Sequence, residues 1–389
     1  MPPLVIHAAR AFTPLEEIRD AAIVVEDGRI ASVGPREGLR LPAGATEQDA
    51  RQFIAVPGFV DVHIHGAGGH DVMEATPTAL RAVASTVARH GTTSILATTV
   101  TANPDDTCRS VDAIASFARG QKADSCAEIL GVHFEGPFIS HARRGVHPAE
   151  WIAAPSVELL RRLLAAAGDM GRILTLAPEL PGALELVAQA RAAGLVVSMG
   201  HTDATCDQAT AAINIGAAHA VHVYNAMRPF THRDSGVLGA VLTSPQVTAE
   251  LIADGVHVDE AAMRLLLAAK GTERVVLVSD ATAATGMPDG VYRLGPFEVN
   301  VKDGVCRNAG GKLAGSTLTL ARALRVIRPL VAQPAPSNIL RMATLNPARL
   351  LGLEKRKGVL APGADADIVL LDDAWNVRSV FCRGVQVQP

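Results

Sequence analysis

The sequence contains few cysteines and no long apolar segment. Its cysteines lie far apart and form no Cys-x-x-Cys pair; the five are Cys108, Cys126, Cys206, Cys306 and Cys382. Their odd number and scattered spacing argue against a disulfide framework or a cysteine zinc site, and predict reduced thiols in a cytoplasmic protein. No run of about eighteen uncharged apolar residues occurs, so we expect no membrane span and no membrane partner.

The sequence also lacks a charge excess of one sign and an N-terminal targeting pattern. The formal net charge is -3 and the pI about 6.5, which argues against nucleic acid or an anionic membrane as the main partner. The first residues, MPPLVIHAARAF, do not combine a basic start with a long apolar segment, so they do not resemble a signal peptide. A small anionic substrate is compatible with this composition, because local Arg and His side chains can bind it.

Apolar residues, in contrast, are abundant and regularly placed. They make up 48% of the 389 residues, enough for one large domain and a small one. Eight apolar segments alternate with amphipathic or Ala-rich segments, and they cover residues 54–63, 93–99, 128–134, 172–177, 195–200, 219–223, 247–253 and 274–279. This alternation predicts an α/β fold, a closed (β/α)8 barrel of the TIM type. The alternative is an open doubly wound sheet, which the absence of a dinucleotide-binding glycine turn disfavours.

The two ends of the chain carry short strand patterns instead. Asp27-Gly28 lies between two apolar runs and predicts a hairpin. Because each end is too small to be stable alone, we expect the two to pair. The predicted division is a small β-sandwich domain of residues 1–54 and 356–389 beside a barrel of residues 55–355. After the last barrel strand, the sequence predicts a hairpin at 297–307 and helices near 316–330 and 337–351.

Six side chains that can bind a metal ion or move a proton follow directly on these apolar segments. They are His63, His65, Glu135, His201, His222 and Asp280. In a (β/α)8 barrel, the active site lies at the C-terminal ends of the strands. These strand ends can therefore assemble a metal site that no single strand could build.

His63 and His65 are two residues apart on an extended chain, so both imidazoles project to the same side, as a shared metal ion requires. The alternative is a surface histidine pair, but the flanking sequences PGFVD and GAGG place the pair where a strand breaks into a loop. A carboxylate such as Glu135, at the end of an apolar strand, is costly to bury unless it is paired or binds metal. An exposed glutamate that begins a loop is the alternative there.

His201 and His222 follow equivalent apolar runs in consecutive units. A single histidine there would more often be structural, but two histidines with one carboxylate suit zinc, and Fe(II), Mn(II) or Co(II) could also bind. Asp280 closes the run VVLVSD and is the natural general base beside a metal ion. Its alternative role is the N-cap of a following helix.

Polar groups in the loops that follow these strands form a predicted rim around the metal. They are the side chains of Asn225, His147, Arg233 and His257 and the backbone of Ala226. Together they predict an electropositive, hydrogen-bonding surface that suits a polar, anionic substrate.

The assembled motifs resemble the amidohydrolase superfamily and, within it, the N-acetylglucosamine-6-phosphate deacetylases. They run in family order over roughly residues 55–355, and they read PGFVDVHIHG, GVHFEGPFIS followed by RRGVH, MGHTDAT, HVYNAM, HRDSGVLGA, IADGVHVD, VSDATAATG and LAGSTLTL. The resemblance implies that Asp280 is the catalytic acid/base and that His257 polarises the substrate. The implied core metal ligands are Glu135, His201 and His222.

The resemblance also implies a substrate pocket and a homodimer. The implied sugar and acetamide contacts are His147, Val146, Asn225, Ala226 and the backbone of Leu313, Ala314 and Gly315. Arg233 would bind the 6-phosphate of a neighbouring subunit's substrate. Some family members lack the histidine pair and hold one metal ion, whereas this chain keeps His63 and His65, so one or two zinc ions are expected. Arg228 replaces a residue that is often apolar in the family, and a second phosphate contact is one hypothesis for it.

The implied activity is hydrolysis of N-acetylglucosamine 6-phosphate to glucosamine 6-phosphate and acetate, in amino-sugar catabolism or recycling. One alternative is the epimeric N-acetylgalactosamine 6-phosphate as substrate. Another is a cyclic amidase or dipeptidase, many of which bridge two metals with a carboxylated lysine. The strands predicted at 128–134 and 172–177 contain no lysine, which argues against that class. A metal-free scaffold protein is disfavoured because every ligand is retained.

Overall fold

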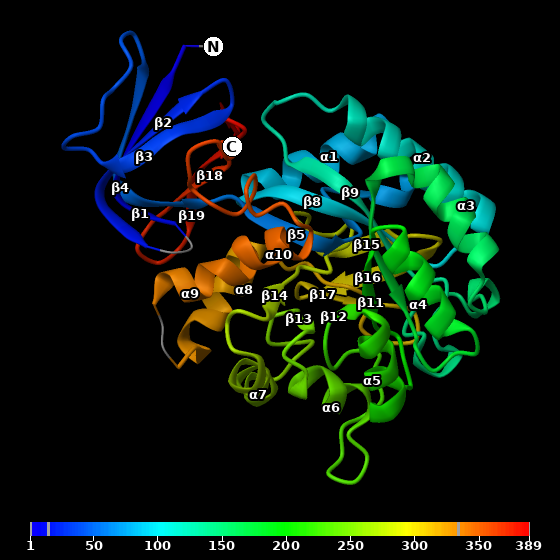
Figure 1. The fold of residues 1–389 in the computed structure, drawn as a ribbon. Coiled ribbons are helices and arrows are strands. Elements are labelled where there is room, and N and C mark those ends of the chain that lie inside the picture. Colours follow the sequence, from blue (N-terminus) through cyan, green and yellow to red (C-terminus); the bar gives the residue numbers. More distant parts are fainter. Residues whose placement is uncertain (1, 14–15, 333–334, 389) are drawn as a thin grey trace.

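The chain forms a barrel of parallel strands with a smaller sheet beside it, in a computed structural model that describes residues 2–13, 16–332 and 335–388 (Figure 1). The barrel strands are β5 (Phe59–Ile64), β8 (Thr92–Thr99), β9 (Glu128–Glu135), β10 (Gly171–Leu176), β11 (Val196–Met199), β12 (Ala217–Ala220), β13 (Thr248–Leu251) and β14 (Val275–Leu277). A parallel bridge between Ile64 and Ala281 closes the ring, and the Asp280 N–H donates to the His63 carbonyl at 2.9 Å. The predicted closed (β/α)8 barrel is therefore confirmed over the open sheet.

Helices follow the barrel strands in turn and surround the ring (Figure 1). They are α1 (Pro77–Arg89), α2 (Pro104–Gly120), α3 (Val157–Ala167), α4 (Ala183–Ala192), α5 (Cys206–Ile215), α6 (Gly236–Thr243), α7 (Glu260–Lys270) and α8 (Leu320–Ile327). Local sequence sets where they begin. Thr76 caps α1 by accepting the Ala79 N–H, and Pro77 occupies the first helical position, where no N–H is needed.

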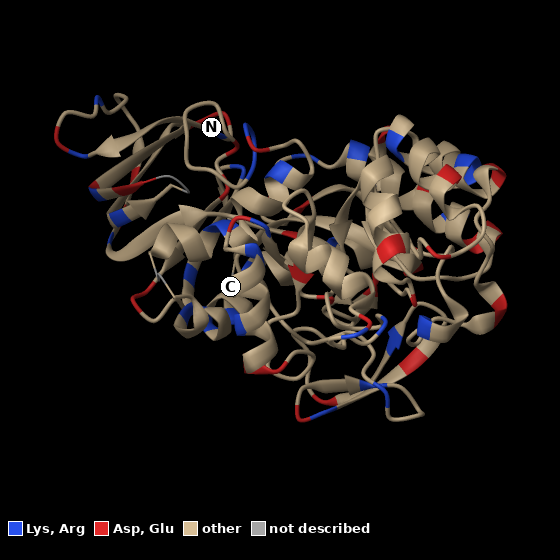
Figure 2. Cartoon of the chain, turned by 60° about the horizontal axis from the view of Figure 1, so that its bottom comes forward, with Lys and Arg blue, Asp and Glu red and all other residues tan. Residues whose placement is uncertain are grey.

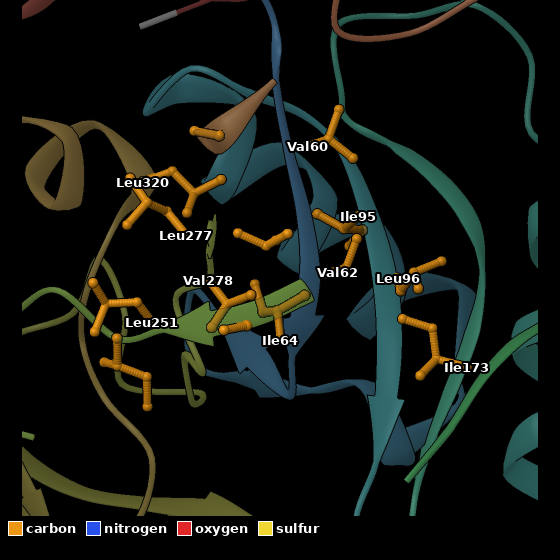
Figure 3. Packing of buried hydrophobic residues seen from close by; sticks show 14 of the residues in the cluster. Val60, Val62, Ile64, Ile95, Leu96, Ile173, Leu251, Leu277, Val278 and Leu320 are labelled. Carbon is orange, nitrogen blue, oxygen red and sulfur yellow. The ribbon is translucent and has the colours of Figure 1, made fainter. Parts of the chain in front are cut away.

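Side chains alternate between two environments along β5. Val60, Val62 and Ile64 pack in the large apolar cluster between strands and helices (Figure 3). The alternating Asp61 and His63 meet polar groups instead: Asp61 accepts the Ser279 N–H, and His63 contacts a glutamate on β13. The inside of the ring is thus polar at this level, while the outer layer supplies the hydrophobic core.

The predicted strands differ from those of the structure by a residue or two at their ends, and two of them differ more. The segment 54–63 contains parts of two strands, β4 (Thr46–Pro57) of the small sheet and β5 of the barrel. Gly58 separates them where the backbone passes close to Thr93, since an added Cβ would lie 2.1 Å from its Oγ1. The segment 219–223 overlaps β12, which ends earlier at Ala220, because the chain turns into a left-handed conformation at His222.

Both ends of the chain build the smaller sheet, as predicted, and lie together in Figure 1. Its order is β20-β19-β18-β4-β1-β2-β3, with β1 (Leu4–Phe12), β2 (Glu17–Glu26), β3 (Arg29–Pro35), β18 (Ile368–Leu371), β19 (Val377–Cys382) and β20 (Val385–Gln386). Asp27 and Gly28 form the predicted turn between β2 and β3. The sheet folds back so that Arg29 bridges to Asp365, and it encloses its own apolar cluster. Residues 1, 14–15 and 389 of this predicted domain lie outside the described residues.

The predicted hairpin at 297–307 is present and is part of a three-stranded meander. Its strands are β15 (Gly290–Leu294), β16 (Phe297–Lys302) and β17 (Val305–Arg307). Leu294 and Val299 pack against Val100, which follows β8, so the meander lies at the carboxyl ends of the barrel strands. A short ribbon of β6 (Gly66–Ala67) and β7 (His70–Asp71) lies at the same end of β5.

The two predicted C-terminal helices are shorter than expected. The first, α8, begins only after its N-cap Thr319, whose side chain accepts the Arg322 N–H. The second is divided into α9 (Pro336–Leu340) and α10 (Leu345–Leu350), because Thr344 between them leaves the helical conformation at φ -129° and ψ -86°. Among the described helices, none has the length and apolarity that crossing a bilayer requires. On the side drawn in Figure 2, acidic and basic residues are interspersed.

Candidate active site

Glu135, at the end of β9, is the centre of the site. Its Oε1 lies 3.0 Å from Nε2 of His201 and 3.0 Å from Nε2 of His222, and these two nitrogens are 3.1 Å apart. All three side chains are buried. Strand ends from three different units thus bring one carboxylate and two imidazoles together.

His63 and His65 approach Glu135 as well. Their Nε2 atoms both lie 3.3 Å from it, His63 at Oε1 and His65 at Oε2. Asp280 completes this part of the site, with its Oδ1 3.2 Å from Nε2 of His65 and 3.7 Å from Nε2 of His63. All six residues singled out in the sequence therefore converge, and Glu135 contacts four histidines of the set.

This donor set fits a divalent metal ion. The potential ligand atoms of His63, Glu135 and His222 lie within 4.8 Å of one another, as do those of His63, His65 and Asp280. The buried Nε2 of His63 has no hydrogen-bond partner among the described residues. Nε2 of His201 and Nε2 of His222 both point at the same carboxylate oxygen, an arrangement that suits a shared cation. Imidazoles combined with a carboxylate are typical zinc ligands.

The backbone turns sharply where the strands end. His201, His222 and Asp280 all have positive φ angles, of 46°, 26° and 48°. This left-handed conformation is disfavoured for residues other than glycine and costs on the order of 1–3 kcal/mol each. Gly200 makes the turn at β11 possible, since a Cβ there would lie 2.1 Å from Val221 Cγ2. The strain is maintained where it directs functional side chains into the centre of the barrel.

Burial and the neighbouring charges set the protonation of these groups. Burial, reinforced by the nearby His147, lowers the pKa of His201 to about 4, so this imidazole is neutral at pH 7, as a metal ligand must be. Burial opposes ionisation of Asp280, but its hydrogen bond with His65 outweighs this and lowers the Asp280 pKa. The carboxylate is therefore ionised and can accept a proton at neutral pH.

Two further histidines are held in fixed orientations at the cavity. Nδ1 of His257 lies 2.7 Å from Oδ2 of Asp254. Burial acts against the charged imidazole, but this bond outweighs it and raises the pKa of His257. Nδ1 of His147 lies 2.8 Å from Oγ1 of Thr101, which leaves Nε2 3.4 Å from Glu135. In each case one ring nitrogen is anchored and the other is available to the site.

The cavity above these groups has a volume of about 230 Å³. It is lined by most of the predicted substrate contacts, namely Val146, His147, Asn225, Ala226, His257, Leu313 and Gly315. Ala314 is buried beside the cavity and packs with Val100 and Leu294. Arg233 is exposed on a loop outside this cavity, so the structure does not bring it to the site of its own chain.

Arg228 is engaged in ion pairs. Its guanidinium donates to Asp234 at 2.6 and 2.8 Å and lies 3.4 Å from Oδ2 of Asp203. It does not line the cavity, so the geometry gives no support to the hypothesis of a second phosphate contact. Arg228 instead holds together the loop that carries Arg233.

Sequence reasoning did not identify several residues of the site. Lys312 and Leu294 line the cavity, and Glu250 lies behind His63 in the barrel. Glu250 had a recognisable signal, because it is a carboxylate within an otherwise buried strand, in VTAELIADG. Lys312 had none, since it follows a glycine-rich turn whose position depends on the tertiary fold.

The chain is similar to known proteins over nearly its whole length. The model of the amidohydrolase family matches residues 54–387. N-acetylglucosamine-6-phosphate deacetylase of Bacillus subtilis (strain 168) is 35% identical, with 98% of this chain and 96% of that protein covered. N-acetylgalactosamine-6-phosphate deacetylase of Escherichia coli O157:H7 is 38% identical, with 98% of each covered. A solved mutant of N-acetyl-D-glucosamine-6-phosphate deacetylase from Mycobacterium smegmatis, in complex with N-acetyl-D-glucosamine-6-phosphate, has a TM-score of 0.92 and 39% identity, with both chains fully covered.

Proposed function

This chain belongs to the amidohydrolase family, and on that basis we propose that it hydrolyses N-acetylglucosamine 6-phosphate to glucosamine 6-phosphate and acetate, a reaction of amino-sugar metabolism. The observation that carries the proposal is the convergence of Glu135, His201, His222 and Asp280 on one buried centre at the mouth of the barrel. The Bacillus subtilis relative that carries this name aligns with 98% of this chain, so the aligned part includes most of the small sheet as well as the barrel.

In the proposed site, Glu135, His201 and His222 hold the core metal ion, and His63 and His65 are available for a second. A divalent ion bound there, most simply Zn²⁺, would supply Lewis-acid activation of water and of the amide carbonyl. These residues come from different strands, so the barrel and not a local motif determines the geometry of the donors. Metal analysis of the purified protein would distinguish Zn²⁺ from Fe²⁺, Mn²⁺ and Co²⁺.

Asp280 is proposed as the acid/base. It is ionised at neutral pH, so it can take a proton from the attacking water and later return it to the nitrogen of the departing amine. His257 lines the same cavity with Nδ1 anchored to Asp254, and we assign it the hydrogen bond to the carbonyl oxygen as negative charge develops there. Carbon–nitrogen cleavage then releases acetate and the free amine.

The remaining lining residues are proposed to bind the sugar. Val146, His147, Asn225, Ala226, Leu313 and Gly315 surround the space beside the reacting centre. Arg233 is proposed to bind the 6-phosphate of the partner subunit in a homodimer. Two features support this: Arg233 lies outside its own cavity, and Phe230 on the same loop is 52% exposed. Light scattering of the purified protein would test the dimer.

A deacetylation assay tests the proposal directly. We expect acetate release from N-acetylglucosamine 6-phosphate, its loss after treatment with a chelator, and its recovery when Zn²⁺ is restored. The unphosphorylated sugar should react with at least about tenfold lower kcat/KM, because a charge-assisted hydrogen bond to phosphate contributes about 1.5–3 kcal/mol. Chelator-resistant activity, or none on the phosphorylated sugar, would contradict the proposal.

N-acetylgalactosamine 6-phosphate is the second candidate substrate, because a deacetylase of that epimer is 38% identical over nearly the whole chain. The two sugars differ only in the orientation of one hydroxyl group. Parallel kinetics on both epimers would separate the two, and a higher kcat/KM on the galacto epimer would favour this second candidate. The free thiols of all five cysteines suit a reducing compartment, and cell fractionation would test the proposed cytoplasmic location.

A further inference from the structure

A chain of buried polar side chains lies behind the histidine pair. Nδ1 of His63 is 2.8 Å from Oε2 of Glu250, whose Oε1 is 2.9 Å from Nε2 of His219. Nδ1 of His219 in turn lies 2.7 Å from Oγ1 of Thr248. The side chains of His63, Glu250 and His219 are all 0% exposed. Burying a carboxylate costs free energy. These polar side chains also occupy space in the barrel interior that apolar side chains would otherwise fill.

The contact with Glu250 determines which nitrogen of His63 faces the site. A carboxylate has only acceptor atoms, so Nδ1 of His63 must donate to it and carries the hydrogen. In the neutral imidazole that a metal ligand requires, the lone pair is then on Nε2, which lies 3.3 Å from Glu135 and has no hydrogen-bond partner among the described residues. This is the arrangement in which a histidine binds a metal ion through one nitrogen while a carboxylate holds the other.

The two oxygens of Glu250 accept three N–H groups. Besides the rings of His63 and His219, the backbone N–H of His222 donates to Oε2 at 3.1 Å. A glutamine has one acceptor oxygen in place of two, so with both histidines in these tautomers its amide NH2 would face an imidazole N–H. The other histidines of the site are held differently: Nδ1 of His65 contacts the Thr98 carbonyl, and Nδ1 of His201 the Arg143 carbonyl.

We propose that Glu250 is a positioning residue for metal binding: it holds His63 in the tautomer and orientation in which His63, with His65, binds a second divalent ion next to the core ion. The inference rests on the proposed metal-dependent function and adds to it a residue that touches neither substrate nor metal. Substitution of Glu250 should therefore weaken binding of the second ion more than binding of the core ion.

Metal counting on the full-length protein tests this role. Wild type and Glu250→Gln are stripped with a chelator, titrated with Zn²⁺ or Mn²⁺, and analysed by mass spectrometry of bound metal. We expect two ions per subunit in the wild type. In Glu250→Gln we expect binding of the second ion to weaken about 10–100-fold and binding of the core ion to weaken less, because Glu250 contacts the core ligand His222 only through its backbone N–H. Electron paramagnetic resonance should show spin coupling between two Mn²⁺ ions in the wild type and its loss in the variant.

Two further variants make the comparison specific. Thr175→Val is the matched control, because it removes a buried hydrogen bond to His133 inside the same barrel, and it should bind both ions normally. Glu250→Asp keeps the buried charge but shortens the reach to His63, so it gives the same test if Glu250→Gln does not fold. His63→Asn should lose the second ion, and combining it with Glu250→Gln should have no additional effect.

Three results would overturn the inference. The first is a wild type that binds a single ion. The second is a Glu250 variant that binds both ions with wild-type affinity. The third is a variant in which the affinity for both ions and the melting temperature of the metal-free protein decrease together. A one-ion protein that deacetylates its substrate would leave the proposed function intact. Failure of deacetylation in a two-ion protein would instead count against the proposed function alone.

Discussion

Asp280 combines three properties at the scale of a single residue. It is buried, it has a left-handed backbone conformation at φ 48°, and its Oδ1 contacts His65. Its N–H and carbonyl are also used, because the N–H donates to His63 and the carbonyl accepts the Ser316 N–H. The carboxylate is therefore held at a fixed place in the site, as proton transfer requires.

Replacing Asp280 with asparagine should separate catalysis from metal binding. Asp280→Asn has nearly the same shape but cannot accept a proton, so we expect kcat to fall at least about 100-fold. Metal content, measured by mass spectrometry, should stay at the wild-type level because Glu135, His201 and His222 are untouched. Loss of the core metal ion would mean that Asp280 is a ligand and not an acid/base, and full activity would refute both roles.

The loop between β12 and α6 shows how ion pairs shape one element. Arg228 joins Asp203, which follows β11, to Asp234 near the end of this loop. Arg143 contacts the same Asp203 at 2.7 Å. These contacts fix the ends of a segment whose tip, including Phe230 and Arg233, is exposed. The loop can therefore present Arg233 to a partner molecule without collapsing onto its own barrel.

Removal of the Arg228 contacts should affect phosphate binding in particular. In Arg228→Met the loop loses its anchor, so we expect KM for the phosphorylated substrate to rise about tenfold, while kcat changes less. Kinetics on the unphosphorylated sugar should be nearly unchanged. Arg264→Met, which removes an exposed ion pair with Glu260 on α7, is the control. Equal effects on both substrates would show that the loop supports the whole cavity and not the phosphate contact.

At the scale of the whole molecule, a buried ion cluster joins the small sheet to the barrel. Nζ of Lys357 is 2.6 Å from Glu128 at the start of β9, 2.9 Å from Asp365 and 2.7 Å from Asp367. Arg356 contacts Glu128 as well. Burial acts to raise the pKa of Glu128, but Lys357 and Arg356 outweigh it and lower the pKa to about 2.

This cluster predicts a specific loss of stability in acid. The pKa of Glu128 is lower in the folded than in the unfolded protein, about 2 against 4.5, so its contribution is fully present above pH 4.5 and is lost as pH falls towards 2. Glu128→Gln removes one of the three carboxylates that contact Lys357, while Asp365 and Asp367 remain, and should lower the unfolding free energy at pH 7 by about 1.5–3 kcal/mol. Denaturation of both proteins between pH 7 and pH 2 measures this. The difference between them should shrink in acid, and a constant difference would contradict the prediction.

Much of the architecture was predictable because its signals are local. Alternating apolar strands and helices indicate a barrel, and residues that follow such strands must share one end of it. His63, Glu135, His201, His222 and Asp280 were identified this way, and all of them converge. The residues at which strands end, such as the end of β12, were less predictable, because the left-handed backbone conformation of His222 depends on the packing around it.

The sequence by itself determined the fold, the family resemblance and the set of side chains that face the site. Only the tertiary structure decided how those side chains are oriented and supported. Glu250 and His63 are 187 residues apart in the chain, and Glu128 and Lys357 are separated by most of the barrel. Such partners are brought together by strand register and by the docking of the small sheet on the barrel. The sequence does not identify them, because alternation within one segment shows which face a residue occupies and not which residue lies opposite it.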